Sequence, residues 1–122
     1  MWPLLGHFRI SQEFRTTDEG RPHDGIDLPA PVGTKIVAPE DGRVVYSGSK
    51  FNGYGKLIIL EHRHGLSTLY GHLSKIYVKP GQFIQKGKTI GRVGKTGRAS
   101  APHLHFEVRK NRIPVDPLRY LK

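Results

Sequence analysis

The sequence predicts an all-β fold from the distribution of its glycines and prolines and from the lack of helical periodicity. Of the 122 residues, 15 are glycine and 9 are proline, and they separate short runs of apolar side chains. No long stretch repeats an apolar residue every three or four positions, as an amphipathic helix would. A chain of this length makes about one ordinary domain, so we expect a single domain over residues 1–122.

Five strands are clearly marked and two are weaker. The expected ranges are 34–37 (weak), 42–47, 56–62, 66–72, 82–84 (weak), 89–93 and 103–109. Residues 63–65 join two of them with a length and a terminal glycine typical of a three-residue hairpin loop. Residues 57–60 are apolar at every position, which predicts a strand covered on both faces.

The two ends of the chain are expected to be less regular. Residues 11–30 lack alternation and contain two glycines and two prolines, so we expect a long ordered loop, and such loops are often functional. Residues 114–122 are expected to form a terminal strap.

Composition excludes several classes of protein. Hydrophobic residues make up 36% and charged residues 25%, which argues against a disordered chain and against a coiled coil. The apolar run 57–60 is too short to span a bilayer, and we recognise no targeting segment at the start. The chain has no cysteine, so any metal ion must be held by His, Asp or Glu.

The net charge of +10 comes from the second half of the chain. Residues 1–61 carry 7 basic and 8 acidic side chains, whereas residues 62–122 carry 13 basic and 2 acidic ones. This excess predicts an anionic partner such as nucleic acid, a membrane surface or an acidic cell-wall polymer.

The strand expected at 103–109 presents two histidines on one face. Successive side chains of a strand point to opposite faces, so the apolar residues that begin with Leu104 face the core. His103 and His105 point to the other face, together with the two charged residues of the strand. Two imidazoles in this arrangement suit a metal site, either with both as ligands or with one as ligand and one nearby.

The remaining histidines are interpreted individually. His62 and His64 lie at a strand end and in the hairpin loop, and we interpret both as surface residues. His72 lies at the opposite end of that hairpin from His64, so one site cannot hold both. His7 has no partner in the sequence and is interpreted as structural.

Residues 23–27 supply further candidate ligands. His23 and a carboxylate in a glycine-containing loop can bend onto one ion, and spacing alone leaves Asp24 and Asp27 both open as that carboxylate. Two histidines and one carboxylate with an open fourth position form the catalytic zinc pattern. A helical His-Glu-x-x-His motif is absent, so the spare histidines would have to act as general base.

Several motifs together resemble one family. The chain is similar to the catalytic domain of the lysostaphin-type zinc metalloendopeptidases, which cut peptide cross-bridges of peptidoglycan. The similarity extends from Trp2 to Tyr120. The matching stretches are residues 23–28, 38–45, 53–55, 67–74, 78–81, 94–97, 102–107 and 114–117.

The resemblance implies a fold and a set of roles. It implies mainly antiparallel sheets packed as a compact sandwich-like or barrel-like domain of the duplicated hybrid motif type, with long loops around a groove. It implies that Zn²⁺ is held by His23, Asp27 and His105, and it thereby favours Asp27 over Asp24. It implies that His72 and His103 are catalytic histidines that do not bind the metal.

The resemblance also implies partners and location. It implies action on peptidoglycan peptides by a monomer outside the cytoplasm, in the periplasm, in the cell wall or as a secreted enzyme, with anionic wall polymers as further partners. Tyr54 and Tyr70 are candidates for lining the groove, although strand packing is the favoured interpretation of both. Ala101 stands where many relatives have a glycine. An alanine has fewer allowed backbone conformations, so the loop before His103 has less conformational freedom.

Three other functions remain as alternatives. The first is a catalytically silent module of the same fold that binds peptidoglycan or activates a hydrolase. The second is a lipoyl or biotinyl carrier-like domain, suggested by residues 78–82 and 86–91, but no lysine stands in the acceptor context that such domains require. The third is a nucleic-acid binder, which only the charge suggests and which the lack of an aromatic-rich strand or groove-reading helix disfavours.

Overall fold

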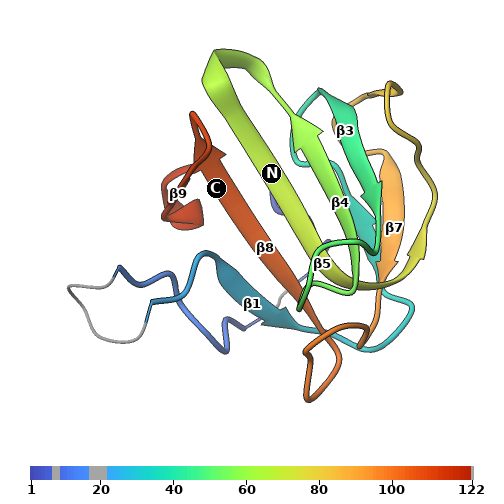
Figure 1. Ribbon diagram of the computed structural model, residues 1–122, viewed down its shortest axis with the longest axis vertical. Coiled ribbons are helices and arrows are strands. Elements are labelled where there is room, and N and C mark those ends of the chain that lie inside the picture. The colour runs from blue at the N-terminus through green and yellow to red at the C-terminus, as the bar shows by residue number, and fades with distance from the viewer. Residues whose placement is uncertain (7–8, 17–21, 122) are drawn as a thin grey trace.

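The computed structural model describes residues 1–6, 9–16 and 22–121, and this part of the chain is built from strands (Figure 1). Two short 3₁₀ turns, η2 (Arg63–Gly65) and η3 (Pro117–Arg119), are its helical segments. The predicted all-β class is confirmed. The strands are β1 (Ile26–Pro29), β2 (Lys35–Val37), β3 (Gly42–Gly48), β4 (Lys56–Glu61), β5 (Leu66–Ile76), β6 (Phe83–Ile84), β7 (Thr89–Val93), β8 (His103–Lys110) and β9 (Ile113–Val115).

All seven predicted strands are present. Two further strands were not predicted, and β5 is longer than predicted. β1 lies inside the segment predicted as a loop, and β9 lies at the start of the predicted strap. Each contains a proline, Pro29 in β1 and Pro114 in β9, and a proline argues against a strand in the sequence. β5 continues four residues beyond its predicted end at His72, because that histidine lies at an irregularity in the pairing of β5 with β4 and not at the end of the strand.

The strands form one antiparallel sheet that divides at β5. Its main order is β1-β8-β5-β4-β3-β6, and β9 adds to the outer part of β8. Residues 66–71 of β5 pair with β8, whereas its last residues pair with β7, which also carries β2. Figure 1 shows β8 on one side of β5 and β7 on the other. Among the described strands the sheet does not close into a barrel.

One hydrophobic core lies between these parts of the sheet. Ile26 of β1, Ile36 of β2, Ile90 of β7 and Phe106 of β8 are all fully buried in the same cluster. The prediction that β4 is covered on both faces is confirmed except at Ile59, which is half-buried. Since strands of both branches share this core, the rigid packing fixes the position of β8 relative to β1 and β5.

The helical segments of the described chain include none that is long and apolar enough to cross a membrane.

We expect the Phe106→Ala substitution to lower the free energy of unfolding by about 3–5 kcal/mol, because it removes a buried ring and leaves a cavity. The ring of Phe106 has 0% exposure and packs 5.5 Å from the ring of Tyr70. Phe83→Ala is the matched control, because Phe83 is 80% exposed, and we expect a change within about 0.5 kcal/mol. Urea denaturation measures both, and equal losses in the two variants would contradict the assignment of the core.

Candidate metal centre

The pairing of β1 with β8 brings two distant parts of the chain together. Asp27 lies directly opposite His105 in the register, so the two side chains share one face of the sheet. Gly25 permits this approach, because a Cβ atom at residue 25 would lie only 2.2 Å from the backbone oxygen of Phe106. The glycine before β1 therefore allows the segment from His23 to Asp27 to lie over β8.

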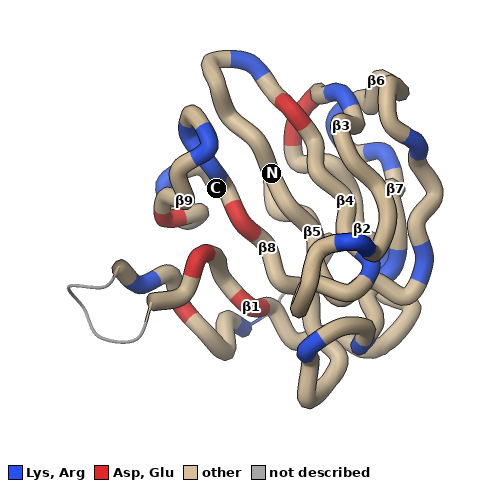
Figure 2. Tube along the Cα trace, viewed as in Figure 1, with Lys and Arg blue, Asp and Glu red and all other residues tan. Residues whose placement is uncertain are grey.

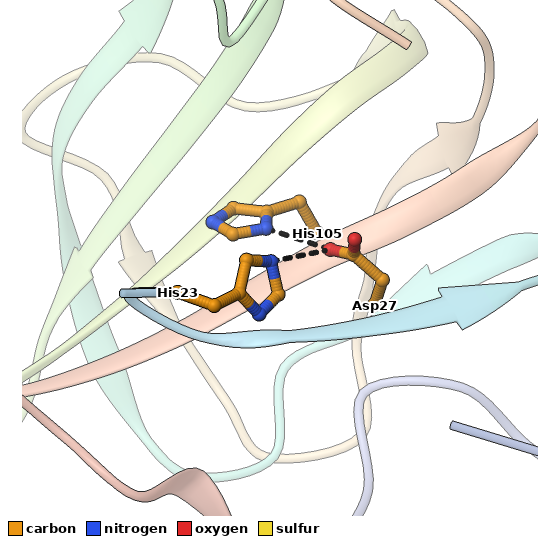
Figure 3. Close-up of side chains that lie close together, drawn as sticks. All are labelled: His23, Asp27 and His105. Atoms are coloured by element: carbon orange, nitrogen blue, oxygen red, sulfur yellow. Dashed lines mark hydrogen bonds and ion pairs between the residues drawn. The ribbon is translucent and has the colours of Figure 1, made fainter. Parts of the chain in front are cut away.

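Three side chains converge at this point (Figure 3). Asp27 Oδ1 lies 2.8 Å from His105 Nδ1 and 3.4 Å from His23 Nε2. The three ligand atoms all lie within 4.8 Å of one another. Tetrahedral zinc, with bonds of 2.0–2.1 Å, separates its ligand atoms by about 3.3 Å. The donor set therefore fits zinc in both chemistry and spacing.

The backbone around the site determines which nitrogen each histidine offers. His23, His72 and His103 each place Nδ1 within 2.7–3.0 Å of a backbone carbonyl oxygen. A carbonyl only accepts hydrogen bonds, so Nδ1 must carry the proton and Nε2 keeps its lone pair. His105 is reversed, because its Nε2 contacts Glu107 and its Nδ1 contacts Asp27.

A buried carboxylate holds His105 in this orientation. Glu107 has 0% exposure, and its Oε2 lies 2.7 Å from His105 Nε2 and 2.5 Å from the hydroxyl of Tyr54. Its Oε1 accepts hydrogen bonds from Arg109, from Nε at 2.8 Å and from Nη2 at 2.7 Å. Second-sphere carboxylates of this kind fix the ring and tautomer of a metal-binding histidine. We infer that Glu107 is a positioning residue for His105.

These contacts shift the pKa values of the charged groups. Burial opposes ionisation of Asp27 and Glu107, but hydrogen bonds and positive charge from His105 outweigh it and lower the pKa of each carboxyl. Burial would lower the pKa of His105, but Asp27 and Glu107 raise it to about 9. Without a metal ion, His105 is therefore an imidazolium between two carboxylates, and a metal must displace the proton on Nδ1.

His72 lies where the sheet divides and has a strained backbone. Its φ angle is +66°, in the left-handed region that non-glycine residues rarely adopt. Such strain is often found at functional sites. Burial lowers the pKa of His72, and the neighbouring His103 and His105 lower it further. His72 is therefore neutral near pH 7, and its ring lies 4.7 Å from that of His103.

A groove of about 610 Å³ opens over the cluster, a size typical of ligand sites. Its floor includes all five histidine and aspartate residues that the resemblance singled out. The groove is lined by Arg9, Ser11, Gln12, His23, Asp27, Pro29, Asn52, Gly53, Tyr54, His72, Arg98, Ser100, Ala101, Pro102, His103 and His105. His103 approaches Asp27 Oδ1 to 3.7 Å, but the compact donor set is the one shown in Figure 3.

The other residues considered from sequence have mixed outcomes. Asp24 is exposed and lies outside the donor set, so the structure brings Asp27 and not Asp24 to the histidines. Tyr54 lines the groove, so its interpretation as simple strand packing is wrong. Tyr70 is fully buried in the core, as expected for strand packing.

The outlying histidines also differ from one another. His64 is exposed, as predicted. His62 is only partly exposed, since it is half-buried and bonds the carbonyl of Asp41 and the hydroxyl of Thr68, each at 2.7 Å. His7 lies outside the described residues.

The role of Glu107 was not predicted from the sequence. The alternation of side chains along β8 correctly places Glu107 on the same face as His105, two residues further along the strand. That spacing was the available signal, because residues i and i+2 of a strand are neighbours on one face. The same spacing makes Arg109 a neighbour of Glu107, whereas Tyr54 could not be assigned to it, because Tyr54 is 53 residues away in the chain.

Comparisons with known proteins agree on a family. The family model described as "Peptidase family M23" matches residues 21–117. The catalytic domain of the antimicrobial peptidase lysostaphin from Staphylococcus simulans superposes with a TM-score of 0.82 at 31% identity, over 93% of this chain and 91% of that one. The structural similarity therefore extends over nearly the whole chain and supports the resemblance found from sequence.

Two curated relatives carry different names. "DD-carboxypeptidase/endopeptidase Mpg" of Neisseria meningitidis is 45% identical over 98 residues, which are 80% of this chain and 22% of the relative. "Murein hydrolase activator NlpD" of Salmonella dublin is 39% identical over 120 residues, which are 98% of this chain and 30% of the relative. The chain thus spans less than a third of either relative.

We expect Glu107→Gln to weaken zinc binding about 10–100-fold, because the variant keeps the size of the side chain but loses the charge that orients His105. Glu61→Gln is the control, since Glu61 is an exposed carboxylate at the end of β4. Competition with a chromophoric chelator measures the affinity, and near-ultraviolet circular dichroism checks that each variant is folded. Wild-type affinity in folded Glu107→Gln would disprove the positioning role.

The raised pKa of His105 predicts how the stability of the metal-free protein depends on pH. Its contribution is complete below the unfolded value of 6.5 and is lost as pH rises through about 9. We expect the free energy of unfolding in chelator to fall over this range by at most about 3 kcal/mol. Urea denaturation at several pH values measures the fall. This decrease in the free energy of unfolding should be absent in His105→Asn. An equal decrease in that variant would show that it does not come from His105.

Proposed function

Because the chain belongs to peptidase family M23, we propose that it is a zinc-dependent endopeptidase that hydrolyses peptide cross-bridges of bacterial peptidoglycan. The observation that carries the proposal is the compact set of His23, Asp27 and His105 at the floor of a groove that two further histidines line. A relative of such an enzyme without catalytic activity would not need all five of these side chains in one groove.

In this proposal His23 and Asp27 hold the zinc ion through Nε2 and a carboxylate oxygen, and His105 holds it through Nδ1. The ion would polarise the scissile carbonyl and lower the pKa of its bound water to about 7. Glu107 keeps the proton of His105 on Nε2, which leaves Nδ1 free to bind.

The two remaining histidines supply the acid and base. His72 is neutral near pH 7, and its protonated Nδ1 donates to the carbonyl of Thr96, so Nε2 is free to accept a proton from the attacking water. His103 has the same orientation, with Nδ1 held by the carbonyl of Ala101. Their rings lie 4.7 Å apart, and both line the groove. The proton that one of them takes from the attacking water would then be passed to the leaving nitrogen, which departs as a neutral amine.

Location and partners follow from the proposed substrate. Peptidoglycan lies outside the cytoplasmic membrane, so we propose that the protein acts there, as a monomer whose groove is complete within one chain. The basic second half favours contact with anionic wall polymers as well. Exposed charges are screened within about 8 Å at physiological ionic strength, so this contact should weaken as salt rises.

The similarity to a murein hydrolase activator favours a second candidate function. In this alternative the groove binds peptidoglycan or a partner hydrolase and cleaves nothing. The two functions differ in what they require of the purified protein, since only the enzyme needs one zinc ion per chain and loses activity in chelator.

We expect His105→Ala to lose both zinc and hydrolysis, and His72→Asn to keep zinc but lose about 10²–10⁴-fold in turnover. Asparagine is chosen because it tolerates the positive φ of residue 72. Digestion of purified peptidoglycan followed by mass spectrometry of the fragments measures cleavage, and elemental analysis measures zinc.

His64→Asn is the matched control, because His64 also has a positive φ, of +61°, and lies at the far end of β5 from the groove. Wild-type turnover in His72→Asn would remove its catalytic role. A wild-type protein that contains no zinc and cleaves nothing would favour the activator function.

A further inference from the structure

The groove contains two arginines that the proposed mechanism does not use. Arg9 and Arg98 line it, whereas Asp27 is the one acidic side chain among the described residues of its lining and already belongs to the donor set. A cleft with this balance of charge attracts anions. We propose that Arg98, with Arg9 in the same groove lining, binds a carboxylate that the substrate carries beside the scissile bond. This inference rests on the proposed function and specifies its substrate class.

The two arginines come from opposite sides of β8. Arg9 precedes a segment whose backbone bonds to β1, with Ser11 N donating to Asp27 O at 2.9 Å. Arg98 lies in the loop before β8 and donates its backbone N–H to Gly53 O, also at 2.9 Å. That glycine stands in the turn that leads into β4, on the β5 side. Since β1 and β5 flank β8, the two arginines reach the groove from segments on different sides of that strand.

The backbone of Arg98 is held tightly against that turn. Gly97 has a φ angle of +74°, and a Cβ atom at residue 97 would lie 2.3 Å from the backbone nitrogen of Gly55. A side chain at this position is therefore excluded by both conformation and space. The close approach brings the guanidinium of Arg98 next to Gly53, with Cζ 3.7 Å from the position of a Cβ there.

The same loop holds the proposed catalytic base. The carbonyl of Thr96 accepts from His72 Nδ1 at 2.7 Å, and its hydroxyl donates to Leu73 O at 2.6 Å. Arg98 follows two residues later, so the base and the arginine are anchored to one short segment. The fold thereby keeps the backbone of Arg98 close to the proposed base.

The guanidinium of Arg98 is available for a ligand. It is exposed, and none of the ion pairs between residues that the structure describes includes it. Figure 2 shows a basic segment in the loop that leads into β8, away from the acidic segments around β1. A guanidinium presents a planar pair of N–H donors that matches a carboxylate. The preferred cross-bridge is therefore one with a free carboxylate, such as a D-alanyl-to-diamino-acid link, and not a neutral glycine-rich one.

The test compares two synthetic cross-linked peptides that differ in one group. The carboxylate on the diamino-acid carbon beside the scissile amide is free in one peptide and amidated in the other. We expect the zinc-loaded wild-type protein to show a kcat/KM about tenfold or more higher for the free carboxylate, mainly through KM. In Arg98→Gln this ratio should fall towards one, and in Arg98→Lys it should be intermediate. Lys95→Gln, which removes an exposed charge of the same loop outside the groove, should keep the wild-type ratio.

An unchanged ratio in Arg98→Gln, or a wild-type protein with no preference, would overturn the proposal. If the wild-type protein cleaves neither peptide, the proposed hydrolysis fails and binding decides the inference. Isothermal titration with the same two peptides then supports it if the free carboxylate binds about tenfold more tightly to the wild-type protein than to Arg98→Gln. Equal binding to both proteins overturns it.

Discussion

The pairing of β1 with β8 is the constraint on which the rest of the site depends. It sets Asp27 opposite His105, and it carries His23 to the same place from the end of a segment that closes over the sheet. Side chains alternate along a strand, so a slip of one residue in this register would turn Asp27 to the opposite face. Gly25 protects the register, because only a residue without a side chain fits against the backbone of β8.

The site also depends on the pairing of one buried charge, the carboxylate of Glu107. A buried carboxylate is costly unless it is paired and hydrogen-bonded. Glu107 meets that requirement with donors from His105, Tyr54 and Arg109. No buried side-chain nitrogen or oxygen in the described part of the chain lacks a hydrogen-bond partner. The network therefore supports a fixed orientation of His105, and its charges are balanced by a cation on each side of the carboxylate.

The division of the sheet at β5 positions His72, which lies on the groove beside the donor set. β5 exchanges one neighbour, β8, for another, β7, at the residue where its backbone turns to positive φ. That residue is His72, which bonds through its backbone N–H to Tyr54 O at 2.7 Å and through its ring to Thr96 O. The local strain of the backbone is thus compensated by contacts with two loops, and both loops line or support the groove.

The sequence by itself determined the all-β class, seven of the nine described strands and the face of β8 on which the histidines lie. These features depend on periodicity within one segment, which a single sequence records. The choice between Asp24 and Asp27 was open from spacing and was favoured for Asp27 only by family resemblance. The tertiary structure decided that choice geometrically, and it also decided the existence of β1, the partners of Glu107 and the place of Arg98 on the groove wall. Each of these depends on contacts between segments far apart in the chain, and such contacts are set by packing of the whole core and not by the local pattern of residues.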